Sequence, residues 1–184
     1  MRYFTLISFL LFSNILFAQK QSAVKSRQIK AVSERFWDNE KPKNNEWSVR
    51  KYDKKGRVAE ELELDKDSLP EKWQRFTYNN LDKVKTIEKL DKKGELRRKV
   101  VCEYNMKGDK TREITTDKEG KLVEKLEISY NAFGDKSEEI ETDEKESVKK
   151  RTIYLYDDKG MLLERNEFDA EGKLSSKKKY RYEY

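Results

Sequence analysis

The sequence contains no histidine and a single cysteine, Cys102. The absence of histidine removes the commonest general base, the Ser/His and Cys/His nucleophile systems, and most zinc and iron sites. A lone cysteine excludes a disulfide within the chain. An enzyme built on this sequence would therefore depend on carboxylates, lysines and tyrosines alone. We predict that the protein is not an enzyme, that it uses no cofactor, and that it has no catalytic, cofactor-binding or metal-binding residues.

Apolar residues are also scarce, since 35% of the chain is hydrophobic and 42% is charged. The long apolar run lies at the N-terminus, from Tyr3 to Phe17, with Arg2 before it and Ala18 after it. This pattern is typical of a secretory signal peptide, here residues 1–18. No second apolar stretch follows, so we predict no transmembrane segment after signal removal. The mature protein is predicted to be exported to the periplasm, the cell surface or the extracellular space.

The abundant residues follow a strict period of 26. Tyrosine recurs at Tyr52, Tyr78, Tyr104, Tyr130, Tyr156 and Tyr182. A second series runs in step with it, at Asp65, Asp91, Asp117, Asp143 and Asp169. No insertion interrupts either series, so the chain is a tandem array. Neighbouring units of an array share their core, which lets it fold with few apolar residues.

Each unit contains two turn patterns. Asp or Asn follows the tyrosine and glycine comes three residues later, as at 157–160, and a similar pattern recurs midway, as at 91–94. The Asp or Asn side chain can cap the turn, and glycine supplies a positive φ. The pattern is degenerate at 65–68 and 143–146, which lack the glycine, and at 79–82 Asp82 replaces glycine at some conformational cost.

The runs of about eight residues between turns have the length of strands. Turns that recur roughly every 13 residues leave too little chain for packed helices. We therefore predict an all-β fold: tandem 26-residue β-hairpin repeats that form one long twisted antiparallel meander sheet, with little helix. The repeat domain spans residues 45–184, with five complete units from Tyr52 and a partial unit before it. Residues 19–44 form a leading segment and a loop, and the sequence leaves open whether 19–38 is helix or strand.

Pairing the two halves of a unit across its midway turn predicts which residues lie opposite each other. Phe168 should face Leu174, Glu113 should face Lys125, and Glu139 should face Arg151. A column here is the set of equivalent positions in successive repeats. In this register the apolar columns lie on one face of the sheet, which we call the dry face, and the charged columns lie on the other, which we call the wet face. Cys102 belongs to an apolar column, so we expect it to be a small buried side chain. The dry face would then need a cover, such as a second copy of the chain.

Three features are candidates for binding. The C-terminal segment carries locally unbalanced positive charge with interleaved tyrosines, at Lys177, Lys178, Lys179, Tyr180, Arg181 and Tyr182. The tyrosine column at 26-residue spacing can stack ligands, although packing between hairpins is the simpler interpretation. The aspartate pairs at 65/67 and 157/158 lack regular calcium-ligand spacing, and turn capping is their simpler role.

The recurring Tyr-Asp/Asn-x-x-Gly pattern, as in 52–56 and 156–160, resembles the YD repeats of RHS-type bacterial proteins, and it is also similar to the shorter MORN-like hairpin repeats. The resemblance covers most of residues 45–184. It implies a continuous sheet of hairpins from an exported bacterial protein with a scaffolding or binding role, and it supplies no catalytic residue.

The predicted function is thus an exported, non-catalytic binding or scaffold module. The alternatives are a secreted hydrolase that uses carboxylates and a toxin-neutralising partner protein. The expected partners are a protein or a carbohydrate, or a second copy through the apolar sheet face, and no specific nucleic acid is expected, because 42 basic residues are interspersed with 36 acidic ones.

Overall fold

The computed structural model describes residues 23–26, 28–38, 41–65 and 67–183. The predicted signal peptide lies outside the described residues and stays a prediction. The chain divides into two compact units. Unit 1 is the chain up to Phe76 together with residues 90–94, and unit 2 is residues 77–89 together with the chain from residue 95 onward.

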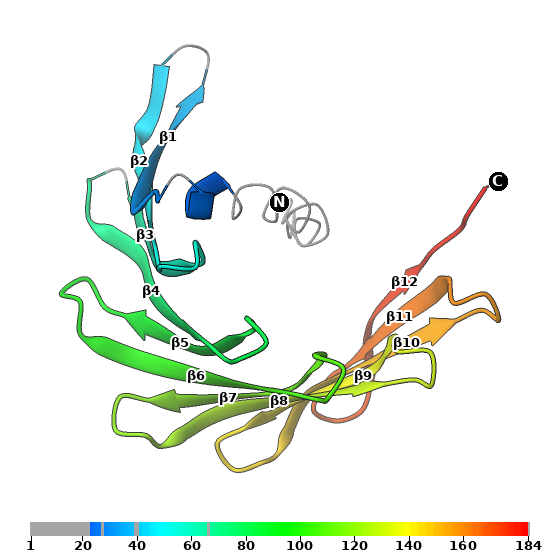
Figure 1. Ribbon diagram of the computed structural model, residues 1–184. Coiled ribbons are helices and arrows are strands. Elements are labelled where there is room, and N and C mark those ends of the chain that lie inside the picture. Colours follow the sequence, from blue (N-terminus) through cyan, green and yellow to red (C-terminus); the bar gives the residue numbers. More distant parts are fainter. Residues whose placement is uncertain (1–22, 27, 39–40, 66, 184) are drawn as a thin grey trace. The chain divides into compact units, whose positions relative to one another are not determined.

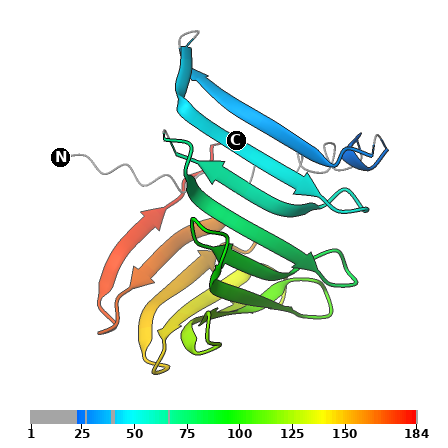
Figure 2. The ribbon, with the colours of Figure 1, turned by 90° about the vertical axis from the view of Figure 1, so that its left-hand side faces the viewer.

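The fold is a meander of twelve antiparallel strands in which each strand pairs with the next in chain order (Figure 1). Figure 2 shows β1 to β4 of unit 1 side by side. The strands are β1 Ala31–Asp38, β2 Lys41–Tyr52, β3 Val58–Leu64, β4 Pro70–Tyr78, β5 Val84–Leu90, β6 Leu96–Tyr104, β7 Lys110–Asp117, β8 Leu122–Tyr130, β9 Lys136–Asp143, β10 Val148–Tyr156, β11 Leu162–Phe168 and β12 Leu174–Lys179. Helix among the described residues is limited to 23–26. The predicted all-β hairpin array is confirmed.

The turns form through the side chain of their first residue. In the turn that joins β7 and β8, Asp117 Oδ1 accepts hydrogen bonds from the backbone N–H groups of Glu119 (3.0 Å) and Lys121 (2.9 Å). The N–H of Gly120 donates to the Asp117 carbonyl (3.1 Å), and Gly120 has a φ of +85°. The same pair of side-chain bonds recurs in the turns headed by Asp53, Asp65, Asn79, Asn105, Asn131, Asp143 and Asp157. The predicted capping is therefore confirmed.

The three turns without glycine adopt the same backbone. Ser68, Asp82 and Glu146 have φ values of +60°, +56° and +62°. Side chains with a Cβ atom are disfavoured in this left-handed region. The hydrogen bonds of the turn evidently outweigh that penalty, so the repeat keeps its geometry where the sequence departs from it.

A β-bulge beside the midway turn changes the register of the hairpin. Leu64 lies opposite Pro70, but Glu63 lies opposite Lys72, so β4 contains one extra residue at this point. The predicted pair of Phe168 with Leu174 sits between the turn and the bulge and is confirmed.

The two predicted charge pairs beyond the bulge are wrong. Glu113 lies opposite Leu126, and Glu139 lies opposite Thr152. The extra residue shifts everything beyond it by one position, and a shift of one position moves a side chain to the other face of the sheet.

The two faces are consequently mixed. Val100 and Cys102 on β6 share a face with Thr115 and Glu113 on β7, so an apolar strand alternates with a polar one. The predicted division into one dry and one wet face is wrong. Among the described residues, the buried hydrophobic side chains are Val24, Val100, Cys102 and Ile128, and the buried polar ones are Ser48, Thr115, Thr142 and Thr152. The continuous apolar face that motivated a homodimer is not formed by the described residues, and the homodimer itself stays a prediction.

Strand predominates among the described residues of the leading segment. Residues 23–26 are helical and β1 follows, so both possibilities left open by the sequence occur. The loop predicted after Asp38 is wrong from Lys41 onward, because β2 begins there. Pro42 lies opposite Trp37 of β1, whereas the pairing of β2 with β3 begins only at Trp47. Pro42 therefore occupies a stretch with one unpaired edge, which tolerates the missing N–H.

Candidate interaction surface

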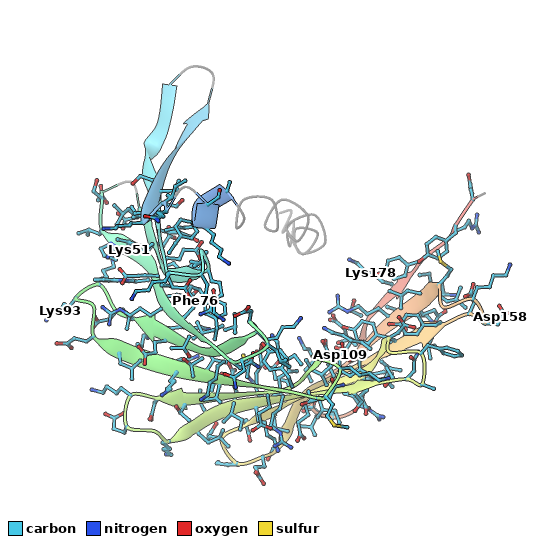
Figure 3. The ribbon with its side chains drawn as sticks, viewed as in Figure 1. Lys51, Phe76, Lys93, Asp109, Asp158 and Lys178 are labelled. Carbon is cyan, nitrogen blue, oxygen red and sulfur yellow. The ribbon has the colours of Figure 1, made fainter. Side chains whose placement is uncertain are left out.

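The predicted basic residues lie on and just beyond β12, at the end of the strand order. β12 pairs with β11 along one edge, and no described strand pairs with its other edge. All six residues of β12 are exposed, and Figure 3 shows Lys178 on this strand. The outer edge of β12 thus offers backbone donors and acceptors to a partner.

The lysines of β12 divide between the two faces of the sheet. Lys177 and Lys179 both contact Glu164 of β11, at 2.8 and 3.6 Å between nitrogen and oxygen. The hydrogen bond from Lys177 lowers the pKa of Glu164 below its usual range. Lys178 instead lies opposite Arg165 in the ladder. Neither Lys178 nor Arg181 forms an ion pair with a described residue, so the positive charge that remains is centred on these two.

Tyr180 and Tyr182 anchor the end of β12 to β11. The Tyr180 N–H donates to the Leu163 carbonyl (2.9 Å), and the Tyr182 hydroxyl donates to the Leu162 carbonyl (3.0 Å). The N–H of Tyr180 points toward β11, and successive residues of a strand point their backbone groups to opposite sides. The N–H groups of Lys177 and Lys179 therefore point to the outer edge of β12, away from β11. The structure thereby brings together the residues that the sequence singled out, although Glu164 neutralises part of their charge.

The tyrosine column connects the two strands of each hairpin at their open end. The hydroxyl groups of Tyr104, Tyr130 and Tyr156 each donate a 2.8 Å hydrogen bond to a backbone carbonyl twenty residues earlier. The acceptors are Val84, Lys110 and Lys136, each the first residue of a strand. Burial raises the pKa of all three phenols. Their hydroxyl groups are therefore used within the fold, which favours the packing interpretation of the column.

A polar network that the sequence did not predict joins three strands of unit 2. Glu139 on β9 accepts hydrogen bonds from Lys136 (2.7 Å) and from the Tyr154 hydroxyl on β10 (2.8 Å). The guanidinium carbon of Arg165 on β11 lies 6.0 Å from the centre of the Tyr154 ring, and Arg165 pairs with Glu167. The predicted register placed Glu139 opposite Arg151, so the bulge hid this network from sequence reasoning.

The network fixes the protonation states of its members. Burial opposes ionisation of Glu139, but the hydrogen bonds from Lys136 and Tyr154 outweigh it and lower the pKa of this carboxyl. Burial and the bond to Glu139 raise the pKa of Tyr154. The pKa of Glu139 and the pKa of Tyr154 both move further from neutral pH, whereas a general acid or base works best with a pKa near the working pH. The network suits structural stabilisation.

The remaining candidates lie inside the fold. Cys102 is buried with 6% of its surface exposed, as predicted, and burial raises the pKa of its thiol. The oxygens of Asp65 and Asp157 accept turn hydrogen bonds. Within the described ranges, no cluster of three or more histidine, cysteine, aspartate or glutamate side chains is arranged to hold a metal ion. No helix among the described residues is long and apolar enough to cross a membrane.

The architecture defines a class of protein, a single-layer tandem β-hairpin array. No family model matches the sequence, and no curated protein matches it. Among solved structures, the chain is similar to part of TcdB2-TccC3-Cdc42, with 14% sequence identity, a TM-score of 0.50, and coverage of 84% of this chain and 9% of that one. The chain thus spans about a tenth of the length of that neighbour. This likeness shows the fold alone and agrees with the YD-like pattern at that level.

A second comparison is weaker. A porin-like protein from Bacteroides uniformis aligns with 76% of each chain at 11% identity and a TM-score of 0.36.

Proposed function

We propose that the protein is an exported, non-catalytic binding or scaffold module built from YD-like repeats, and that it binds its partner at the outer edge of β12. The observation that carries the proposal is a fully exposed strand whose outer edge pairs with no described strand and whose free charge is positive. Export is supported by the N-terminal apolar run, which follows the pattern of a signal peptide. The hydrolase and toxin-neutralising alternatives stay predictions, because no feature of the described residues favours either.

The geometry of β12 favours an extended protein segment as the partner. A strand added at a sheet edge gains main-chain hydrogen bonds, and side chains on alternate faces give specificity. Lys178 and Arg181 would attract carboxylates on such a segment, whereas the lysines that contact Glu164 would contribute less. The proposed partner is therefore an acidic segment in β conformation.

A peptide titration tests this mode. We would add a peptide of alternating glutamate and valine to the ¹⁵N-labelled protein, with a lysine and valine peptide as the matched control. The glutamate peptide should shift the amide signals of Lys177 and Lys179 and leave those of the interior strands unchanged. Equal shifts with both peptides, or shifts spread over the whole sheet, would contradict binding at this edge.

A pair of charge-reversal variants separates local from overall charge. Lys178→Glu with Arg181→Glu should weaken binding of the glutamate peptide at least about tenfold, because both unpaired cations are lost. Lys118→Glu with Lys121→Glu changes the net charge equally, but in the turn between β7 and β8, and should have little effect. If the two pairs weaken binding alike, only the net charge of the protein matters and the assignment to β12 is wrong.

A further inference from the structure

The two edges of unit 2 differ in the residues at their turn tips. The turns that follow Tyr78, Tyr104 and Tyr130 expose the apolar side chains of Leu81, Met106 and Phe133, at 59%, 103% and 86%. Along the opposite edge, the tips at 118–119, 144–145 and 170–171 carry lysine, glutamate and one alanine. Large apolar side chains thus project at three consecutive turns of one edge.

The same three turns lack a carboxylate at their first position. Asparagine stands there, at Asn79, Asn105 and Asn131, whereas the other turns of the repeat from Asp53 onward begin with aspartate. The fold does not require this change, because asparagine accepts the same two backbone hydrogen bonds, for example from Phe133 (3.0 Å) and Asp135 (2.9 Å) to Asn131. Each of these turns still carries one carboxylate at a later position, Asp82, Asp109 or Asp135. Because a carboxylate is costly to remove from water, asparagine at the first position spares each turn a second one, which suits an edge that enters a less polar medium.

The tips are held at fixed positions. In the turn that carries Met106, the N–H of Gly108 donates to the Asn105 carbonyl (3.0 Å). Neighbouring turns are connected by the bonds from Tyr104 to Val84 and from Tyr130 to Lys110. Adjacent turns on one edge are two strands apart, or about 10 Å. The fold thus presents three separate apolar side chains on a rigid row.

The spacing decides between a protein and a lipid partner. Charged side chains stand between the tips, so the tips do not merge into the continuous apolar centre of a stable protein interface. A bilayer interface is fluid and can close around separate apolar groups, while neighbouring charges stay among the headgroups. The charges of these three turns are Asp82, Lys83, Lys107, Asp109, Lys110, Asp135 and Lys136. Lysines slightly outnumber aspartates, so phosphate groups are not repelled.

We propose that this edge of unit 2 binds the surface of a phospholipid bilayer by inserting Leu81, Met106 and Phe133 into its interfacial region. The proposal does not depend on the partner site at β12, because different residues carry it. Both sites can therefore be tested in the same protein.

Vesicle co-sedimentation tests the proposal. The mature chain would be mixed with vesicles of pure phosphatidylcholine and with vesicles that also contain phosphatidylglycerol. We expect binding to both, because apolar insertion does not require anionic lipid. Phe133→Ser should weaken binding at least about tenfold, and the triple variant Leu81→Ser, Met106→Ser, Phe133→Ser should abolish it. The matched control, Glu171→Ser at a tip of the opposite edge, should bind as the original chain does.

Three outcomes would overturn the proposal. The first is no binding of the original chain to either vesicle. The second is binding to anionic vesicles alone that salt removes and the triple variant retains, because that is surface electrostatics. The third is self-association that the triple variant loses, without vesicle binding, since the edge would then join two copies. The altered side chains are exposed, so an unchanged thermal melt will show that the variants remain folded.

Discussion

The hydroxyl of Tyr130 donates a 2.8 Å hydrogen bond to the backbone carbonyl of Lys110, at the start of the strand twenty residues earlier. The bond joins the last residue of β8 to the first residue of β7, at the open end of this hairpin. Its repetition at Tyr104 and Tyr156 makes the tyrosine column a connection between the two strands of successive hairpins. The hydrogen bond in these hairpins explains why tyrosine stands at this position rather than another large apolar residue.

Tyr130→Phe should lower the free energy of unfolding by about 1 kcal/mol, because the ring stays and only the hydrogen bond is lost. Urea denaturation followed by circular dichroism measures the change. Tyr180→Phe is the control, since the Tyr180 hydroxyl has no hydrogen bond to a described residue, and it should be near neutral. Equal losses in the two variants would show that the hydroxyl bond contributes nothing measurable.

Truncation of the whole ring should have a larger effect. Tyr104→Ala should destabilise by about 3 kcal/mol, as expected for the loss of a packed aromatic side chain. Lys125→Ala should destabilise by at most about 1 kcal/mol, since its ion pair with Glu127 is 3.6 Å long. Thermal melts of both variants compare them. Similar melting temperatures would contradict a fold whose hairpins are held together by the tyrosines.

Gly120 and Glu146 occupy the same turn position in successive units, with φ values of +85° and +62°. Glycine has no penalty in this region, and other residues lose about 1 to 2 kcal/mol there. Glu146→Gly should therefore stabilise the protein by about 1 kcal/mol, and Gly120→Ala should destabilise it by a similar amount. Chemical denaturation gives both values. A loss of stability in Glu146→Gly would mean that the Glu146 side chain contributes more than its strained backbone costs.

The sequence predicted the positions of the turns correctly, but it did not predict which side chains share a face of the sheet. The turn at Asp117 and Gly120 is encoded locally, because a side-chain cap and a positive φ depend on residues within four positions of each other. The bulge beside each midway turn adds one residue without changing the period of 26. The spacing therefore contained no signal for it, and the predicted contacts beyond it failed. The network of Glu139, Tyr154 and Arg165 was missed for that reason.

Gly94 has a second constraint besides its φ of +82°. A Cβ atom at this position would lie 2.9 Å from Cη2 of Trp73, whereas one at Gly120 would meet nothing within 4 Å. Gly94→Ala should therefore destabilise more than Gly120→Ala, which carries the backbone penalty alone. In a Trp73→Leu background the extra loss should shrink, and a double-mutant cycle from urea denaturation measures that coupling. No coupling would mean that the indole moves aside freely.

The network around Glu139 should make stability depend on pH at its acid end. The folded state lowers the pKa of Glu139 below the reference value of 4.5. The contribution of this carboxylate is then fully present above pH 4.5 and is lost as the pH falls through the lower folded value. Glu139→Gln should reduce stability by about 1 to 2 kcal/mol at neutral pH, and the difference from the original chain should shrink as the pH falls below 4.5.

Urea denaturation at a series of pH values measures this profile, with Glu144→Gln as the control. Glu144 is exposed in the turn between β9 and β10 and has no ion pair with a described residue, so its replacement should leave the profile unchanged. Tyr154 affects the dependence of stability on pH at its alkaline end. Its raised pKa means that its contribution holds below pH 10 and is lost only as the pH rises above that value. A difference between Glu139→Gln and the original chain that stays constant from acid to neutral pH would show that ionisation of Glu139 does not stabilise the sheet.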